Sequence, residues 1–221
     1  MTLAGAIQGP ADPPPDCRLC PRLTKFRRSN KKDYPDYFNG ATPSAGPRSA
    51  RLLIVGLAPG LHGANRTAKP FTGDSAGDLL YATLEKFGFS KGEYVAERPG
   101  SVLLKGTVIT NAVRCVPPQN KPTGAEITKC RRFLTGQIAQ LSKLRAVLCL
   151  GRIAHDSTLA ALGMKQSEAP FAHGAVHKLD SANITLFDSY HCSRYNTNTR
   201  RLTPEMFESV FADIRRLIDR R

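Results

Sequence analysis

The sequence predicts an α/β protein, a single domain with a central sheet of about four parallel strands flanked by helices. Two observations support this fold. Short apolar runs that suit buried strands alternate with segments whose apolar residues recur at helical spacing. Polar or glycine-rich segments follow three of the apolar runs, as expected where parallel strands end beside a ligand.

The first two strands are predicted from continuous apolar character. Residues 51–57 (RLLIVGL) suit a strand that is buried on both faces, and residues 76–87 follow with helical apolar spacing. Residues 102–110 predict the second strand. Thr123 and Glu126 have the spacing of a capping box, so we expect a helix to begin there.

The second half of the chain repeats this alternation. Residues 145–150 predict the third strand and residues 184–189 the fourth, with a helix over 153–162 between them. The pair Thr203–Pro204 predicts the start of the last helix, because proline suits the first helical turn. Its apolar stripe is Phe207, Val210, Phe211, Ile214, Leu217 and Ile218.

The N-terminal region differs in composition from the rest. Residues 1–16 are expected to be a flexible lead-in, because Gly, Pro and Ala dominate them, and residues 17–221 are expected to form the domain. Residues 20–48 are basic, aromatic and rich in turn formers, which predicts a short helix followed by a long loop.

The charge indicates a polyanionic partner. The chain has 32 Lys and Arg against 18 Asp and Glu, a net charge of +14, and a pI near 9.9. Nucleic acid is the first candidate. No apolar run is long enough for a membrane span and no signal peptide is visible, so we expect a soluble, cytoplasmic protein without membrane contact.

Six cysteines in a reducing compartment favour metal binding or catalysis over disulfides. Cys17 and Cys20 form a CxxC, and Cys115 and Cys130 complete a possible quartet of thiolates. A zinc ribbon normally uses two compact CxxC pairs, so this uneven spacing fits an iron–sulfur cluster better, and zinc stays the alternative. Cys149 lies in an apolar strand and is expected to be a core residue.

Three unusual segments are expected at one edge of the sheet. Residues 56–74, 111–118 and 191–199 each follow a predicted strand, and the carboxyl ends of parallel strands meet at one edge. We therefore expect a composite site there. Loop glycines such as Gly56 and Gly60 let backbone amides approach a ligand.

These segments carry a family resemblance. GLAPGLHGANRTAKPFTGDSAGDLL, TNAVRC with VPPQNKPTGAEITKC, and HCSRYNTNTRRLTPEMF together resemble the uracil-DNA glycosylase superfamily, specifically its family 5, the UDGb branch. The resemblance extends from Cys17 to the last helix. It implies a [4Fe-4S] cluster on Cys17, Cys20, Cys115 and Cys130, which is regarded in that family as structural.

The resemblance also implies a pocket for a base that is rotated out of DNA. Phe71 would stack on that base, and the amide of Asn111 would pair with the edge of uracil. Backbone amides around Gly56, Ala58 and Gly60 would stabilise the negative charge that develops on the departing base.

His191 and Asp74 are the expected catalytic side chains, together with Asn111. A neutral His191 can donate a hydrogen bond to uracil O2 as charge builds there. Asp74 would orient water or steady the sugar cation, or it would only cap a helix. His62 is a further candidate for pocket polarity. The chain departs from the family at Cys192, where a proline is usual, and at Ala68–Lys69, where Gly-Arg is common. Gly60–Leu61 replaces the Asp or Asn base of several related branches, which is typical of family 5.

DNA contacts are expected from residues around the same segments, with Tyr195 and Arg194 filling the space that the base leaves. The expected contacts are Arg66, Lys69, Ser193, Arg194, Tyr195 and Asn196, with Arg114, Arg200 and Arg201 as further phosphate ligands.

The sequence therefore predicts a monomeric, monofunctional DNA glycosylase that hydrolyses the N-glycosidic bond of uracil in single- or double-stranded DNA, for base-excision repair. Hypoxanthine and other deaminated or modified bases are further expected substrates. No lysine in these motifs is placed for strand cleavage. Two alternatives stay open: a noncatalytic iron–sulfur DNA-binding module, and an enzyme acting on free nucleosides or nucleotides.

Overall fold

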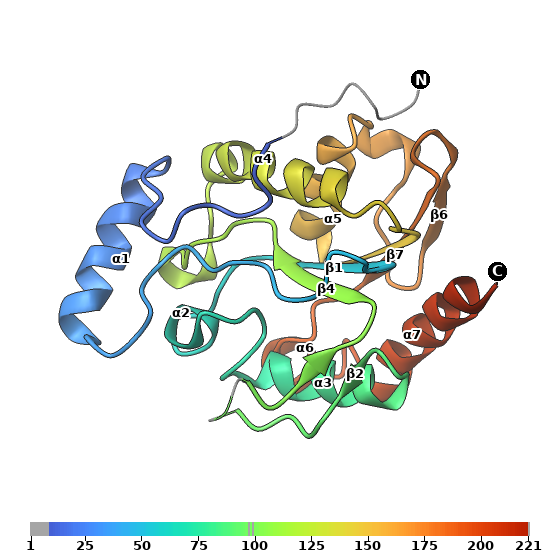
Figure 1. Cartoon of the computed structure of the whole chain (residues 1–221), viewed down its shortest axis with the longest axis horizontal. Helices are drawn as coiled ribbons and strands as arrows, with labels where there is room; N and C mark the ends of the chain where they lie inside the picture. Colours follow the sequence, from blue (N-terminus) through green and yellow to red (C-terminus); the bar gives the residue numbers. More distant parts are fainter. Residues whose placement is uncertain (1–8, 97, 99, 221) are drawn as a thin grey trace.

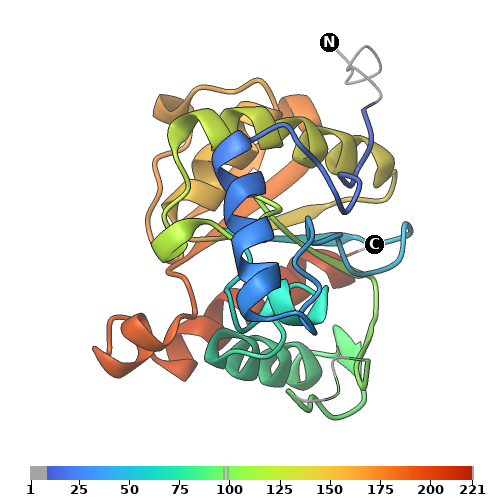
Figure 2. The same cartoon turned by 90° about the vertical axis from the view of Figure 1, so that its left-hand side faces the viewer.

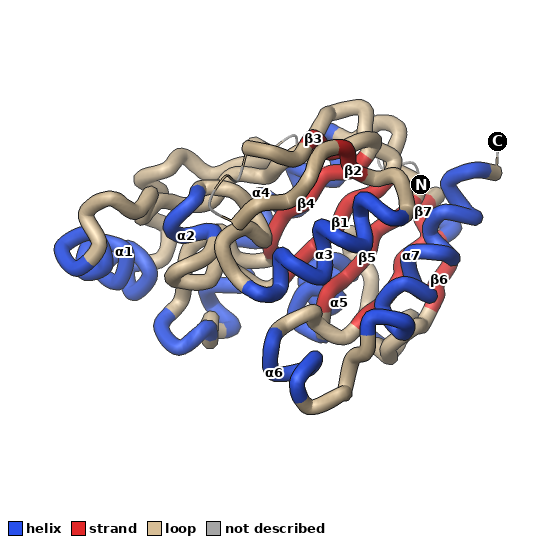
Figure 3. Tube along the Cα trace, turned by 90° about the horizontal axis from the view of Figure 1, so that it is seen from below, coloured by secondary structure: helices blue, strands red, loops and turns tan. Residues whose placement is uncertain are grey.

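The computed structural model describes residues 9–96, 98 and 100–220. Its main sheet has five strands in the order β4-β1-β5-β7-β6. The four predicted strands are present and parallel: β4 (Thr107–Asn111), β1 (Leu52–Gly56), β5 (Ala146–Leu150) and β7 (Ile184–Ser189). The sheet has one strand more than the four expected, because β6 (Val176–Leu179) adds an antiparallel edge strand beside β7 (Figure 3).

Helices cover both faces of this sheet, which confirms the predicted α/β architecture (Figure 1). Helices α3 (Ser75–Lys86) and α7 (Pro204–Asp219) pack on one face. Helices α4 (Gly124–Gln140) and α5 (Arg152–Ala161) pack on the other. The sheet is therefore buried on both sides, which explains why its parallel strands read as continuous apolar runs.

The two cores alternate along each strand. Leu52 and Ile54 of β1 belong to the core beneath α3 and α7, while Leu53 and Val55 belong to the core beneath α4 and α5. All four are fully buried. Successive side chains of a strand point to opposite faces. This alternation therefore fixes which side chains of β1 face each pair of helices.

Helix starts agree closely with the sequence signals. Thr123 and Glu126 form both hydrogen bonds of the capping box at the start of α4. Thr203 accepts a hydrogen bond from Met206 N at the start of α7, with Pro204 in the first turn. These caps satisfy backbone N–H groups that the helix itself leaves free.

Several elements differ from the prediction. The strand expected over 102–110 is split into β3 (Leu103–Leu104) and β4, and β3 pairs with β2 (Ser90–Lys91) as a separate hairpin. The predicted strand is interrupted at Gly106, whose φ of +59° does not fit an extended strand. Helix α1 (Pro21–Asp33) has 13 residues where a short helix was expected. Two further short helices lie in predicted loops, α2 (Ala64–Thr67) and α6 (Arg194–Asn198).

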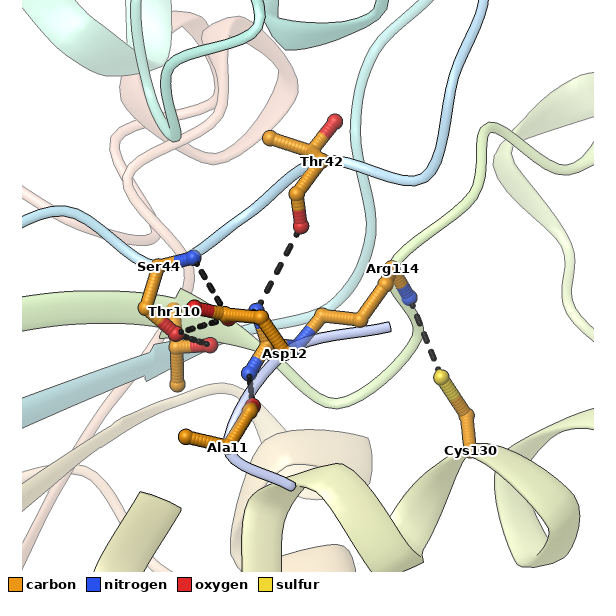
Figure 4. A network of polar contacts seen from close by, with 7 residues as sticks. All are labelled: Ala11, Asp12, Thr42, Ser44, Thr110, Arg114 and Cys130. Atoms are coloured by element: carbon orange, nitrogen blue, oxygen red, sulfur yellow. Dashed lines mark hydrogen bonds and ion pairs between the residues drawn. The ribbon is translucent and has the colours of Figure 1, made fainter. Parts of the chain in front are cut away.

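Part of the expected lead-in contacts the domain. Residues 1–8 lie outside the described residues, but Asp12 Oδ1 accepts hydrogen bonds from Ser44 N, Ser44 Oγ and Arg114 Nη1, each at 2.8 Å (Figure 4). The backbone of Gly9 and Pro10 lies against Gly136 of α4, where a side chain would not fit. No helix in the described part of the chain has the length and apolar character needed to cross a membrane.

Candidate active site

The three segments that the sequence singles out meet at the edge where the parallel strands end. Gly56 and Asn111 are paired in register as the last residues of β1 and β4. His191 follows the end of β7 at Ser189. Figure 2 views the molecule from this side, with α1, α2 and α6 arranged around the edge.

A cleft of about 620 Å³ opens at this edge. Its walls come from the turns after β1, β5 and β7 and from the start of α3. The predicted residues in its wall are Ala58, Gly60, Asp74, His191, Ser193 and Arg194.

The wall also contains residues that the sequence analysis did not propose. Asn120 comes from the loop before α4, and Gly151, Arg152 and Ile153 come from the start of α5. The segment after β5 follows the same rule as the other loops, since it begins where a parallel strand ends. It was missed because α5 begins at Arg152, directly after Gly151, so no long polar or glycine-rich loop follows β5.

Phe71, Asn111 and Gly56 form a second group beside the cleft wall. A side chain at Gly56 would collide with the Phe71 ring and with Asn111 Oδ1, so only glycine allows their close approach. Asn111 is 3% exposed, and its Oδ1 has no hydrogen-bond partner among the described residues. Asn111 Oδ1 is therefore able to accept a hydrogen bond from a bound group.

Phe71 lies in an unfavourable backbone conformation, with a φ of +56°. A bulky side chain rarely adopts a positive φ, and such residues concentrate at functional sites. The Phe71 ring faces the His191 ring at a centroid distance of 5.7 Å and an interplanar angle of 25°. The structure thus places Phe71 and Asn111 against Gly56, and His191 against Phe71.

Asp74 has two roles open to it in the structure. It is the N-cap of α3, and its Oδ1 accepts a hydrogen bond from Gly77 N at 3.2 Å. Its Oδ2 lies over the Gly60–Gly63 turn, where a side chain at Gly60 would come within 3.1 Å of it. Burial raises the pKa of the Asp74 carboxyl above its usual value. Capping and participation in the cleft are therefore compatible, because each uses a different oxygen.

We expect His191 to be neutral at physiological pH. Burial lowers its pKa to about 4, because desolvation disfavours the imidazolium. Asn196 Nδ2 donates to His191 O at 2.8 Å, which makes Asn196 a support for this loop. Cys192 is fully buried and its thiol lies 3.4 Å from Ala76 O, so packing against α3 holds the loop where the family usually has proline.

The expected phosphate ligands fall into two groups. Arg194, Tyr195, Lys69, Arg200 and Arg201 are exposed, and Tyr195 has 72% of its surface accessible. Arg66 is half-buried, with its Nε bonded to His62 O at 2.9 Å. Arg201 also lies over the Tyr190 ring.

The prediction that Arg114 contacts a DNA phosphate is wrong. It is 1% exposed, and its guanidinium donates to Asp12 and to the carbonyls of Ala11 and Thr42 (Figure 4). The sequence could not reveal this, because the partner carboxylate comes from the segment expected to be flexible.

The four cysteines of the predicted quartet line one small cavity, together with Leu23, Val113 and Phe133. Burial raises the pKa of Cys130 to about 11 and that of Cys115 to about 12. Arg114 N donates a hydrogen bond to Cys130 Sγ at 3.3 Å. Cys149 lies elsewhere, fully buried in the core beneath α4 and α5, which confirms its expected role.

Four thiols around one cavity are a donor set that suits an iron–sulfur cluster and also suits zinc. In the part of the chain that the structure describes, no group of three or more His, Cys, Asp or Glu side chains is arranged to hold a metal ion as it stands. Hydrogen bonds to sulfur, such as that from Arg114 N to Cys130, are a usual feature of iron–sulfur sites.

Known proteins resemble this chain over most of its length. A family model described as "Uracil DNA glycosylase superfamily" matches residues 43–215. The chain is 44% identical over 208 residues to a "Type-5 uracil-DNA glycosylase" of Thermus thermophilus, covering 91% of this chain and 93% of that protein. It is 37% identical to proteins of the same name from Mycobacterium bovis (91% of this chain, 78% of that one) and Pyrobaculum aerophilum (88% and 86%). The chain belongs to the uracil-DNA glycosylase superfamily, in its type-5 branch.

Proposed function

We propose that this protein is a monofunctional DNA glycosylase that removes uracil from DNA and leaves an abasic site for base-excision repair. The observation that carries the proposal is the buried Oδ1 of Asn111, which has no partner among the described residues and lies with the Phe71 ring against Gly56, while the His191 ring faces Phe71. Uracil presents an N–H donor next to a carbonyl acceptor, and an Asn amide offers the complementary acceptor and donor. The name of the relatives supports the same activity.

The reaction breaks the bond between N1 of uracil and C1′ of the sugar, and both electrons leave with the base. Negative charge then grows on uracil O2. A neutral His191 donates a hydrogen bond there without losing its proton, and the low pKa of about 4 keeps it neutral. Backbone amides of the turn that contains Ala58 and Gly60 add donors at the same wall of the cleft.

Water completes the reaction at C1′. Its oxygen bonds to the sugar carbon, and its proton passes to a base and finally to the released uracil. Asp74 Oδ2 is the carboxylate in the cleft wall that suits this task, and its negative charge also stabilises the sugar cation. Among the described residues that line the cleft there is no lysine, which favours hydrolysis over a Schiff base and strand cleavage.

The cysteine cavity would hold a [4Fe-4S] cluster through Cys17, Cys20, Cys115 and Cys130, with a structural role. It lies apart from the cleft wall, and the two share no lining residue among those described. Visible absorption together with iron and zinc analysis of the purified protein tests this assignment. Iron with broad visible absorption is the expected result, and zinc without it would overturn the cluster.

The activity is tested with an oligonucleotide that contains one uracil. We expect an intact strand after incubation and scission at the uracil position after alkali, with no scission in a thymine control. Parallel hypoxanthine oligonucleotides and free deoxyuridine define the substrate range. DNA binding without alkali-labile sites would favour a noncatalytic module, and release from deoxyuridine alone would favour a nucleoside enzyme.

A further inference from the structure

Helix α1 carries cations that the rest of the described chain does not neutralise. Six of its 13 residues are Lys or Arg. Arg22 pairs with Glu126 at 2.7 Å, and Arg27 is buried and donates to the carbonyls of Pro15 and Cys17. The other four are exposed and form no salt bridge with any described residue: Lys25, Arg28, Lys31 and Lys32.

Three of these cations border a hollow in the surface. This hollow, which we call the α1 groove, has a volume of about 510 Å³. Its lining has four cations, two hydroxyls and no carboxylate, namely Arg18, Pro21, Thr24, Lys25, Arg28, Ser29 and Lys32. Arg18 has only a long, exposed contact of 3.9 Å to Asp16. A concave surface of this composition suits a chain of anionic groups with several oxygens each, such as phosphodiesters.

Helix α1, which carries the groove, and helix α6, whose first residue Arg194 lines the cleft, lie on the same side of the molecule (Figure 2). Helix α1 stands in front of the edge where the strands end, in the view that also contains α6 (Figure 2). An aromatic step joins the end of α1 to the cleft loop. Tyr34 stacks on Tyr37 at 4.7 Å, and Tyr37 Oη lies 3.1 Å from His62 Nδ1. His62 lies in the turn that also contributes Gly60 to the cleft wall.

Helix α1 is held firmly in this position. Leu23 is buried against Cys115, Cys130 and Phe133. Arg27 ties the helix to the backbone of the preceding CxxC segment. A ligand on the exposed face would therefore meet cations that are already in place, and binding would not have to order the helix.

We propose that the α1 groove binds the sugar–phosphate backbone of DNA on one side of the extruded nucleotide. The aromatic step of Tyr34, Tyr37 and His62 then lies beneath the bound DNA strand, between the groove and the cleft. Flat rings in this position can stack with bases. This inference rests on the proposed function for the identity of the cleft's ligand. It adds a second, sequence-independent contact that sets affinity and register.

Charge-neutral variants test the proposal. The groove variant is Lys25→Gln/Arg28→Gln/Lys32→Gln. The matched control is Lys105→Gln/Lys143→Gln/Lys178→Gln, which removes the same charge from exposed lysines elsewhere. Affinity for a uracil-free duplex is measured at several salt concentrations. Since each lost phosphate contact lowers the salt slope by about 0.9, the groove variant should lose about 2 to 3 units of slope and the control almost none.

Uracil release provides the second readout. The groove variant should show a raised KM on a long uracil oligonucleotide and an unchanged kcat, and it should match wild type on an oligonucleotide cut short on both sides of the uracil. Equal affinity and equal salt slope for the two triple variants would overturn the groove assignment. Binding is measured on uracil-free DNA, so the two tests have independent outcomes. A wild-type protein that releases no uracil would contradict the proposed function, and the salt-slope comparison would still decide whether the groove binds DNA.

Discussion

The cleft and the cysteine cavity both lie beyond strand ends, but they are built in different ways. The cleft is walled by turns that directly follow β1, β5 and β7, so the register of the sheet positions its groups. The cavity is walled by four separate stretches, around Pro13, Cys17–Thr24, Val113–Cys115 and Cys130–Phe133. Only the third of these follows a strand directly.

Because the two sites are built differently, we expect them to affect different properties of the protein. The cleft needs no ligand to hold its walls, because neighbouring strands hold the turns at fixed spacing. The cavity joins the lead-in, α1 and α4, which have no sheet between them. A group bound to all four thiols would hold these parts together, since binding free energy at such a site contributes to folding. We therefore expect changes in the cavity to alter stability and changes in the cleft to alter rate.

The largest effect is expected from Cys130→Ser. Loss of one thiol should abolish the visible absorption and lower the melting temperature by about 10 °C or more. Uracil release at low temperature should stay close to wild type. Cys149→Ser is the matched control, because Cys149 is equally buried but lies outside the cavity. Equal losses of stability in the two variants would remove any special role for the cavity.

A smaller effect, on rate alone, is expected from Asp74→Asn. The amide keeps an oxygen that can cap α3 but loses the negative charge, so the rate of uracil release should fall about 100-fold at unchanged stability. Asp74→Ala should lose the same rate and also about 1 kcal/mol of unfolding free energy. Because burial raises the pKa of Asp74, wild-type activity should decline as acid protonates it, and the Asn variant should lack that decline. Full activity of Asp74→Ala would leave capping as its only role.

Asp12→Asn tests the edge of the cavity. Arg114 would remain buried with its charge no longer balanced, and breaking a buried pair is strongly destabilising. Because the Asp12 side chain is 38% exposed, solvent reduces the cost, and we expect about 2 kcal/mol in urea unfolding. Asp16→Asn should have no measurable effect, since Asp16 and its partner Arg18 are both exposed. If Asp12→Asn is equally silent, the lead-in does not stabilise the domain.

The smallest effect concerns His155, which is buried in α5. Its Nδ1 lies 2.8 Å from Asp188 Oδ1 and its Nε2 lies 2.8 Å from Ala169 O, so both nitrogens face acceptors. Burial opposes the charge on His155, but Asp188 outweighs it and the pKa of His155 is raised. The stabilisation is thus complete below the unfolded pKa of about 6.5 and is lost as pH rises through the folded pKa.

Urea unfolding at a series of pH values checks this. The wild-type free energy should decrease with rising pH relative to His155→Gln. Parallel curves for wild type and His155→Gln would show that the pair is not charged.

The sheet and the site could be predicted to different extents. Buried parallel strands are continuous apolar runs in the sequence, so the strands around the cleft could be predicted from the sequence alone. The edge strand β6 was not, because His177 and Lys178 interrupt its apolar character and solvent reaches it. Helix α1 was underestimated, because it buries only Leu23, Arg27 and Asn30 and so has no apolar stripe.

Among the site residues, the sequence placed His191 and Asp74 beyond strand ends and Asn111 just past a strand that in the structure includes it as its last residue. They could not show that Asn111 Oδ1 lacks a partner or that Arg114 is buried beneath Asp12, because both facts depend on segments far apart in the chain. The pairing of Asn196 with His191 O was missed for a related reason, since a short helical turn that brings them together has no periodic pattern.

The central claim is that the cleft stabilises the electrons of a departing base through a neutral His191. Single-turnover uracil release by His191→Ala, at saturating enzyme and at pH values from mildly acidic to mildly alkaline, tests it most directly. We expect a rate about 100- to 1,000-fold below wild type with little change in affinity for uracil-containing DNA. A wild-type rate in this variant, at any of these pH values, would contradict the claim.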